Sequence, residues 1–334
     1  MRWPSVIHSR KTIYLGLDIT TTSIKLLALY YKNEQYWIQA FGHCALDAGV
    51  MQGHFVHDIS GLAQAIQQLL IDLELWSKTQ SDLEIVIALP DACTINKIIT
   101  VSERLSDEDI EELVHLELDK WSPGAAYDLC FDFKRLQVSS NPGSNLKEIL
   151  IVAARIQHVQ DRVSALQAIG LRTKVVDIES FAIRRVFPFI AIETPGVALL
   201  LDITMPFLKI YFFKNQHLIF LREEECDGLF PTLMTTEDPS LALYLESMLL
   251  RIKRACHFFY AAHPQYEDIT QIFLSGIGAQ WGNLKAFLEQ RLSKPIQIAN
   301  PFLQMNALSE SNLHDLHREA ALYLTACGLA KRVC

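Results

Sequence analysis

The stretch from residue 12 to residue 30 reads T-I-Y-L-G-L-D-I-T-T-T-S-I-K-L-L-A-L-Y. An apolar run rich in β-branched residues ends at Asp18, a polar turn follows, and a second apolar run begins at Ile24. Two such runs around a short polar segment are typical of antiparallel strands joined by a tight turn. We therefore predict a β-hairpin with a polar tip between Thr12 and Tyr30.

The tip of this hairpin carries groups that suit a phosphate. Asp18 offers a carboxylate to Mg²⁺ or its water ligands, and Lys25 offers a cation to an anionic ligand. Between them lie four hydroxyl residues whose turn amides can also meet an anion: Thr20, Thr21, Thr22 and Ser23. Threonine and serine are also common in ordinary turns, so this stretch alone leaves a nucleotide site and a plain hairpin equally open.

The composition sets the class of protein. A chain of 334 residues, with 50% hydrophobic and 20% charged residues, is long enough for two globular domains. Its formal net charge of −8 and the lack of a Lys/Arg cluster argue against nucleic-acid binding. No apolar run approaches the roughly 18 residues of a membrane-spanning helix, so we expect no transmembrane segment.

The compartment follows from the N-terminus and the cysteines. The first eleven residues lack the apolar core of a secretion signal. The 7 cysteines are odd in number, widely spread and never spaced as C-x-x-C, as expected for reduced thiols. We expect a cytoplasmic protein.

Residues 1–90 read as a first β-β-β-α-β domain. After the hairpin, Tyr36–Gly42 is predicted as a third strand. Ser60 is a suitable N-cap for an amphipathic helix that ends near Trp76. The apolar run Leu83–Leu89, closed by a proline, is predicted to return to the sheet.

Residues 91–177 have a different rhythm and are predicted as an inserted α+β subdomain. Its helix, Ser106–Trp121, starts with S-D-E-D, which resembles a capping box. A second helix is expected to stop at Gly170, a C′ glycine, and a last short strand holds Lys174–Val176. No residue of this subdomain stands out as chemically active.

From residue 195 the opening pattern repeats. A strand Val197–Ile203 contains Asp202 near its end, and two further strands and a long helix follow, with Asp238 as N-cap and Pro239 at the first helical position. Residues 195–304 are thus predicted as a second domain. Residues 178–194 and 305–334, including a helix His314–Ala330, are expected to complete the first.

This internal duplication favours the nucleotide site over the plain hairpin. Two β-β-β-α-β halves with an aspartate near the end of each first strand predict a cleft in which Asp18 and Asp202 face each other. The S-G-I-G turn at Ser275–Gly278 brings backbone close to a ligand through Gly276 and Gly278, next to a helix N-terminus.

Taken together, the chain resembles the actin-like ATPase superfamily and, within it, the type IV pilus assembly protein PilM family, related to FtsA. The resemblance rests on these segments: G-L-D-I-T-T-T-S-I-K-L (16–26), I-V-I-A-L-P (85–90), L-S-D-E-D-I-E-E-L (105–113), V-A-A-R (152–155), G-L-R-T-K-V-V-D-I-E-S-F-A (170–182), L-S-G-I-G-A (274–279) and A-N-P-F (299–302). It implies an α/β, actin-like (ribonuclease H-like) fold with duplicated domains and the inserted subdomain.

The resemblance also implies a site for ATP with Mg²⁺ between the two halves. The residues that match it are Asp18, Thr20, Thr21, Thr22, Ser23, Lys25, Asp202, Gly276 and Gly278, with Asp18 and Asp202 toward the metal. No catalytic residue is assigned.

Several departures from the family pattern point to a degenerate or slow ATP site. Thr20 stands where the first loop usually has glycine, and the second loop, D-I-T-M-P-F-L, lacks both the glycine and the final threonine of the pattern. The segment Leu229–Asp238 is short for the outer subdomain that holds one side of the adenine. We expect nucleotide binding to be weak or absent, and these departures disfavour hydrolysis.

For partners, the resemblance implies the N-terminal cytoplasmic peptide of the inner-membrane protein PilN, bound in a groove beside the inserted subdomain, together with other proteins of the pilus inner-membrane complex and motor. The protein would then lie at the inner membrane through its partners. Two alternatives remain: an FtsA-like cell-division filament, which the absence of a basic amphipathic tail after the last helix disfavours, and a small-molecule kinase in which Asp202 assists phosphoryl transfer.

Overall fold

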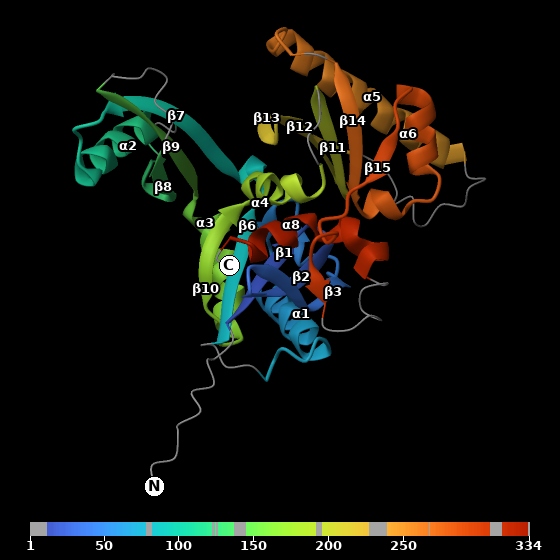
Figure 1. Ribbon diagram of the computed structural model, residues 1–334. Helices are drawn as coiled ribbons and strands as arrows, with labels where there is room; N and C mark the ends of the chain where they lie inside the picture. The colour runs from blue at the N-terminus through green and yellow to red at the C-terminus, as the bar shows by residue number, and fades with distance from the viewer. Residues whose placement is uncertain are drawn as a thin grey trace.

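The structure is a computed structural model that describes residues 12–77, 82–121, 124, 126–136, 145–191, 196–226, 239–266, 268–307 and 316–332. Two lobes, each built on one sheet, stand one above the other, and a smaller unit projects beside the upper lobe (Figure 1). The predicted β-β-β-α-β repeat is therefore present twice.

The first sheet contains the opening hairpin. Its strands are β1 (Ile13–Ile19), β2 (Ser23–Lys32), β3 (Gln35–Ala45), β6 (Leu83–Leu89), β10 (Thr173–Ile178) and β16 (Asn306–Ala307). Their order across the sheet is β10-β6-β1-β2-β3-β16, with β1, β2 and β3 antiparallel. A small hairpin of β4 (Met51–Gln52) and β5 (Phe55–Val56), which the sequence did not predict, follows β3.

Both faces of the first sheet are covered, which explains the nearly unbroken apolar run of β1. Leu15 and Leu17 pack in one core with helices α1 (Ile59–Asp72) and α3 (Ile156–Ala168). Gly16 points to the opposite face, where a Cβ atom would lie 1.9 Å from the Ala326 carbonyl oxygen of α8 (Leu324–Ala330). Glycine at this position lets the last helix lie directly on the strand.

Helix α1 differs from the prediction at both ends. Ser60 lies inside its first turn, because Asp58 is the N-cap residue and its carbonyl oxygen accepts the amide of Leu62. At the other end Glu74 has a φ of +55°, and the amide of Trp76 bonds back to Leu70. The chain has therefore already left the helix before Trp76.

The end of the insertion also differs from the prediction. Strand β10, which holds Lys174–Val176, pairs in parallel with β6 of the first sheet, and α3 packs against α1. Both elements thus share the apolar core of the first lobe. Gly170 ends α3 with a φ of +74°, as predicted for a C′ glycine. We propose that the inserted unit ends at Arg155 rather than at residue 177.

The inserted unit itself is a small two-layer sandwich. Strands β7 (Thr94–Ser102), β9 (Leu146–Arg155) and β8 (Leu129–Arg135) form its sheet in that order, and α2 (Asp107–Trp121) covers one face. The predicted capping box is present. The Ser106 amide donates to Asp109 Oδ2 at 2.9 Å, and the Asp109 amide donates to Ser106 Oγ at 3.2 Å.

The second sheet repeats the first hairpin. Its strands are β11 (Val197–Thr204), β12 (Phe207–Lys214), β13 (His217–Glu225), β14 (Ile269–Gly276) and β15 (Ile296–Ile298), in the order β13-β12-β11-β14-β15. Helices α5 (Pro239–Ala262) and α6 (Leu284–Leu292) belong to this lobe. Pro239 opens α5 as predicted, whereas the predicted N-cap Asp238 lies outside the described residues.

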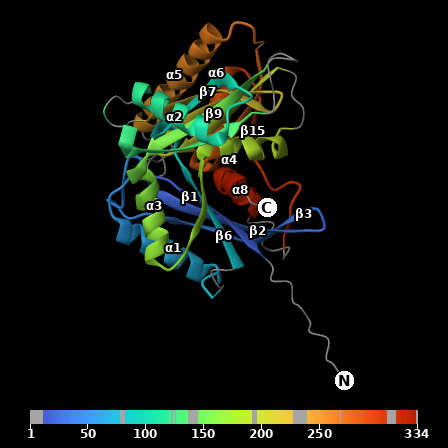
Figure 2. The same ribbon diagram turned by 90° about the vertical axis from the view of Figure 1, so that its left-hand side faces the viewer.

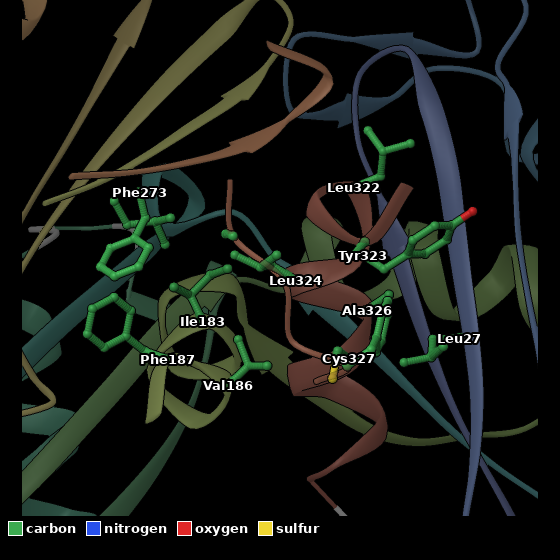
Figure 3. Close-up of a cluster of buried hydrophobic side chains, with 14 of the residues drawn as sticks. Leu27, Ile183, Val186, Phe187, Phe273, Leu322, Tyr323, Leu324, Ala326 and Cys327 are labelled. Atoms are coloured by element: carbon green, nitrogen blue, oxygen red, sulfur yellow. The ribbon is translucent and has the colours of Figure 1, made fainter. Parts of the chain in front are cut away.

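The two lobes share an apolar core around α4 (Glu179–Val186) and α8. Phe187, just after α4, stacks on Phe213 of the second sheet with ring centroids 3.7 Å apart, and Tyr323 packs on the first sheet beside Leu27 (Figure 3). The predicted helix His314–Ala330 is interrupted: residues 316–319 are helical, Ala320–Tyr323 is a 3-10 turn, and α8 follows. Residues 314 and 315 lie outside the described part of the chain.

Nothing in the described ranges has the length and apolar character that a membrane-spanning helix needs.

Candidate functional site

The first hairpin brings Asp18 and Lys25 side by side. They are direct cross-strand partners of β1 and β2, which puts both side chains on the same face of the sheet. Lys25 Nζ lies 3.5 Å from Asp18 Oδ2 and 3.4 Å from Thr20 Oγ1, and both charged residues are buried. The predicted carboxylate and cation therefore already satisfy one another within the hairpin.

The hydroxyl residues of the tip are used largely within the turn. The Thr20 hydroxyl donates to the Ser23 carbonyl oxygen at 2.9 Å, and the Thr20 amide donates to the same oxygen at 2.9 Å. The Thr21 hydroxyl donates to the Gly53 carbonyl oxygen at 3.0 Å, and the Thr22 carbonyl oxygen accepts the amide of Leu46. These contacts fix the turn and tie it to the β4–β5 hairpin.

The second hairpin repeats the charged pair, which sequence reasoning missed. Asp202 of β11 is the cross-strand partner of Lys209 of β12, as Asp18 is of Lys25. The two loops read D-I-T-T-T-S-I-K and D-I-T-M-P-F-L-K, so the lysine stands seven residues after the aspartate in both. This shared spacing was the available signal for Lys209.

Lys209 lies in a buried cluster of acids that bridges the lobes. Its Nζ forms an ion pair with Glu179 of α4 and lies 3.9 Å from Glu223 of β13. Burial alone lowers the pKa of Lys209, but the carboxylates of Glu179, Glu223 and Asp202 outweigh it and raise that pKa above its usual range. Lys209 is therefore held charged by residues of the protein itself.

The β4–β5 hairpin of the first lobe contacts this cluster through His54. Its Nε2 lies 2.9 Å from Glu223 Oε1, and its ring stacks on Phe207 of β12 with centroids 4.3 Å apart. Burial raises the pKa of Glu223, but the hydrogen bond from His54 and the charge of Lys209 outweigh it, so that pKa is lowered. The contact joins the two lobes at the mouth of the cleft.

Arg162 of α3 is a further cation at this mouth. It is fully buried and donates to the carbonyl oxygens of His158 at 3.1 Å and His54 at 2.9 Å, while its Nε has no hydrogen-bond partner. Burial lowers the pKa of Arg162 from its ordinary value. Tertiary packing alone brings this residue here, and nothing in the local sequence signals it.

Asp202 is affected by its burial. Burial raises the pKa of Asp202 to about 6, against the opposing effects of Lys209 and of the Ser275 hydroxyl, which donates to Asp202 Oδ1 at 2.8 Å. The charge of Asp18 also raises this pKa and that of Lys25 lowers it. The two hairpins are therefore close enough to act on one another.

The predicted glycines of the S-G-I-G turn have a packing role. Gly276 has a φ of +71°, and a Cβ atom there would lie 2.2 Å from the Ile203 carbonyl oxygen. A Cβ atom on Gly278 would lie 2.5 Å from Ile203 Cδ1. Both positions need glycine because β11 ends against them, which accounts for the motif without a ligand.

The tip of the second hairpin is apolar where the first is polar. Met205 is buried and accepts a hydrogen bond on its sulfur from the Tyr244 hydroxyl at 3.1 Å, and the peptide bond from Met205 to Pro206 is cis. This tip packs into the core of the second lobe. The four hydroxyl residues of the first tip have no equivalent here, apart from Thr204 in the place of Thr20.

The space between the hairpins is small. A pocket of about 10 Å³ is lined by residues that include Thr20, Thr21, His54, Arg162, Glu179 and Lys209. That volume is about enough for one water molecule. In this conformation the pocket does not accommodate the phosphates of a nucleotide, and within the described ranges no group of three or more His, Cys, Asp or Glu side chains is placed to hold a metal ion.

A family profile described as type IV pilus assembly protein PilM matches residues 16–236 and 230–334. Among solved structures, the chain is similar to one titled "PilM-PilN type IV pilus biogenesis complex", with a TM-score of 0.76 and 21% identity over 95% of this chain and 97% of that one. It is also similar to the ethanolamine utilization protein EutJ from Carboxydothermus hydrogenoformans, with a TM-score of 0.52 and 13% identity over 95% and 89% of the two chains.

These likenesses agree with the two repeated halves and the inserted unit described above. The predicted α/β fold of the actin-like ATPases is confirmed.

Proposed function

The chain belongs to the PilM family of type IV pilus assembly proteins, and from that premise we propose that it is a scaffold of the pilus machine that binds the N-terminal cytoplasmic peptide of PilN. The observation that carries the proposal is the match over nearly the whole chain, inserted unit included. In this role the protein lies on the cytoplasmic side of the inner membrane through its partners. Other proteins of the inner-membrane complex and the motor are further proposed partners.

The inserted unit offers a surface on which a peptide could dock. Val101 of β7 packs against α2, so alternation along the strand turns Ile98 to the other face of the sheet. Ile98 is 54% exposed there. An extended peptide with apolar side chains can bind an open sheet of this kind. We propose this face as one side of the peptide groove.

We propose further that the site between the hairpins is a degenerate or slow ATP site. Three features support this: the closed pocket, the apolar second tip and the use of Lys209 by Glu179 and Glu223. A nucleotide with Mg²⁺ would have to separate these ion pairs to enter. Asp18, Lys25 and the amides of the first tip would then be its first contacts.

The peptide proposal is tested by titrating the full chain into a fluorescent peptide that copies the N-terminus of PilN and measuring anisotropy. We expect saturable binding that Ile98→Glu weakens at least tenfold, because a charge then replaces the exposed apolar side chain on this face. Leu303→Glu is the matched control, since Leu303 is 67% exposed in the turn between β15 and β16, outside the inserted unit. No binding above that of a scrambled peptide would contradict the proposal, and equal weakening by both variants would contradict the proposed face.

The nucleotide proposal is tested by thermal unfolding with Mg-ATP. A ligand present at ten times its dissociation constant adds about 1.4 kcal/mol of stability, or a rise in Tm of about 2–4 °C. We expect a rise of this size at millimolar ATP, its loss in the double variant Asp18→Ala, Lys25→Ala, and at most slow phosphate release. Equal shifts in both proteins would exclude the cleft as the site, and rapid phosphate release would contradict a degenerate or slow site.

A further inference from the structure

Helix α5 has two exposed leucines on one face. Leu243 is 74% exposed and Leu250 is 69% exposed, although most leucines of the described chain are buried. Ser247, Arg254 and His257 lie on the same face, and the five residues follow one another at alternating spacings of four and three. This is the spacing with which a helix presents one face to another helix.

The same face of α5 is largely basic, because its one acid, Glu246, forms an ion pair with Arg291 of α6. Lys253 and Arg254 are exposed and form no ion pair or hydrogen bond within the described residues, while Arg251 lies 3.8 Å from Glu224. Ser247, Leu250, Arg251 and Arg254 line a hollow of about 400 Å³. An apolar side chain flanked by carboxylates is the chemistry that this hollow fits.

Helix α2 of the inserted unit presents that chemistry. Leu116 is 60% exposed in the middle of the helix. Glu112 and Asp119 lie four residues before it and three residues after it, so both are on the same face and both are exposed. The exposed residues of α2 include further acids at its start, and Lys120 is the basic residue nearest to Leu116 on this face.

We propose that α2 of one copy of this protein docks on α5 of a second copy, with Leu116 in the hollow beside Leu250 and with Glu112 and Asp119 facing Arg254 and Lys253. The occupant is argued from charge complementarity: an acidic face and a basic face of one chain each have an exposed leucine at their centre. A protein with a net charge of −8 carries this basic face as an exception to its overall charge.

The contact joins different surfaces of the two copies. Helix α2 lies on the left of the inserted unit and α5 on the upper right of the second lobe, and the quarter turn of Figure 2 brings α2 toward the viewer and leaves α5 behind it. A contact between unlike surfaces leaves one free α2 and one free α5 in a dimer. Addition of further copies therefore gives a row or a ring.

The association should be weak and sensitive to salt. Exposed ion pairs contribute little each, and they are screened within about 10 Å at 0.1 M salt. We expect self-association in the micromolar range or weaker at low ionic strength, falling as salt is added. The contact involves neither PilN nor a nucleotide. The outcome of its test is therefore independent of the peptide and nucleotide tests.

The test is sedimentation velocity of the purified full chain over a range of concentrations at low and high salt. Arg254→Glu and Glu112→Lys are each expected to reduce association at least tenfold, because each puts like charges opposite one another. An equimolar mixture of the two single variants should associate again, since each then supplies the surface that complements the other. Glu111→Lys, the same charge change on another side of α2, is the matched control and should associate like the wild type.

Thermal unfolding checks that each variant is folded, and all three positions are exposed. A chain that stays monomeric at every concentration would overturn the proposal, and so would association that neither reversal weakens or that the mixture does not restore. If α5 binds anionic vesicles or an acidic peptide while the chain itself stays monomeric, the proposed occupant is wrong.

Discussion

The hairpins β1–β2 and β11–β12 share a loop of the form D-I-T followed by three residues, an aliphatic residue and lysine, yet their lysines have different surroundings. Lys25 meets one carboxylate at 3.5 Å and a threonine hydroxyl. Lys209 meets Glu179 and Glu223 and stands beside Asp202. The same motif therefore forms a single Asp–Lys ion pair in the first lobe. In the second lobe its lysine is the centre of an ionic contact between the two lobes.

The second hairpin therefore has a structural role that the first hairpin lacks. Its apolar tip lies in the core of the lobe, and its lysine compensates acids from α4 and β13. A phosphate that approached Lys209 would compete with these acids. The first hairpin has no such role, and it is where we expect a nucleotide to make its first contacts.

Substitution of Lys209 is expected to have the largest effect on the free energy of unfolding. Lys209→Met keeps the length of the side chain but leaves the buried Glu179 without its ion-pair partner and Glu223 with His54 alone, so we expect a loss of about 3–5 kcal/mol in the free energy of unfolding. Lys25→Met removes one pair and should lose clearly less, about 1–3 kcal/mol. Urea unfolding followed by circular dichroism measures both, and equal losses would contradict the proposed difference between the lysines.

The sequence predicted the parts of this site that depend on strand alternation and chain order. In a tight hairpin, the spacing of Asp18 and Lys25 makes them cross-strand partners. The internal repeat predicted that Asp202 belongs to the same site. The same spacing would have identified Lys209. His54 and Arg162 could not be found this way, because only the packing of the β4–β5 hairpin and of α3 brings them to the cleft.

Fold prediction failed where tertiary contacts override local signals. Strand β10 follows the inserted unit without a break in sequence, but its pairing with β6 assigns it to the first sheet. The helix predicted for residues 314–330 is broken, and a Cβ atom on Gly328 of α8 would lie 2.0 Å from the Ala182 carbonyl oxygen of α4. That close approach shows how tightly α8 is fitted against α4, which local propensity does not show.

The second prediction concerns the glycine that closes the second hairpin against β14. Gly276→Ala adds a Cβ atom 2.2 Å from the Ile203 carbonyl oxygen at a φ of +71°, and both the overlap and the strained backbone are costly. We expect a loss of about 3 kcal/mol in the free energy of unfolding. Gly53→Ala beside the first hairpin is the control, because a Cβ atom there has open space, and it should lose about 1 kcal/mol. Similar values for the two would show that the packing at Gly276 adapts.

The third prediction is a pH dependence that belongs to the second aspartate. Because burial raises the pKa of Asp202 from 3.8 to about 6, the folded state binds the proton more tightly than the unfolded state. Its contribution to stability is therefore present at low pH and is lost as the pH rises through about 6. Between pH 4 and 6 this loss amounts to about 2 kcal/mol.

Asp202→Asn cannot titrate, so its unfolding free energy should fall less steeply across this range than that of the wild type. Urea unfolding at several pH values measures the two curves. Asp91, whose pKa burial also raises to about 6, is present in both proteins, so the difference between the curves isolates Asp202. Parallel curves would show that Asp202 is no more protonated in the folded protein than in the unfolded chain.

The smallest effect is expected at the tip of the first hairpin. Thr21→Val removes the hydrogen bond to the Gly53 carbonyl oxygen. Because this bond is exposed to water, its loss should lower the free energy of unfolding by less than about 1 kcal/mol. Thr22→Val is the control, because the Thr22 side chain forms no hydrogen bond among the described contacts. This variant should change the free energy of unfolding less than Thr21→Val does. A loss of several kcal/mol from Thr21→Val would mean that the first tip contributes to the stability of the fold as much as the second tip does.

Met205, which stands in the repeat where Thr21 does, is buried in an apolar core. A small effect at Thr21 would therefore show that the first tip can change its contacts at little cost in stability, which is what a loop must do to admit a phosphate.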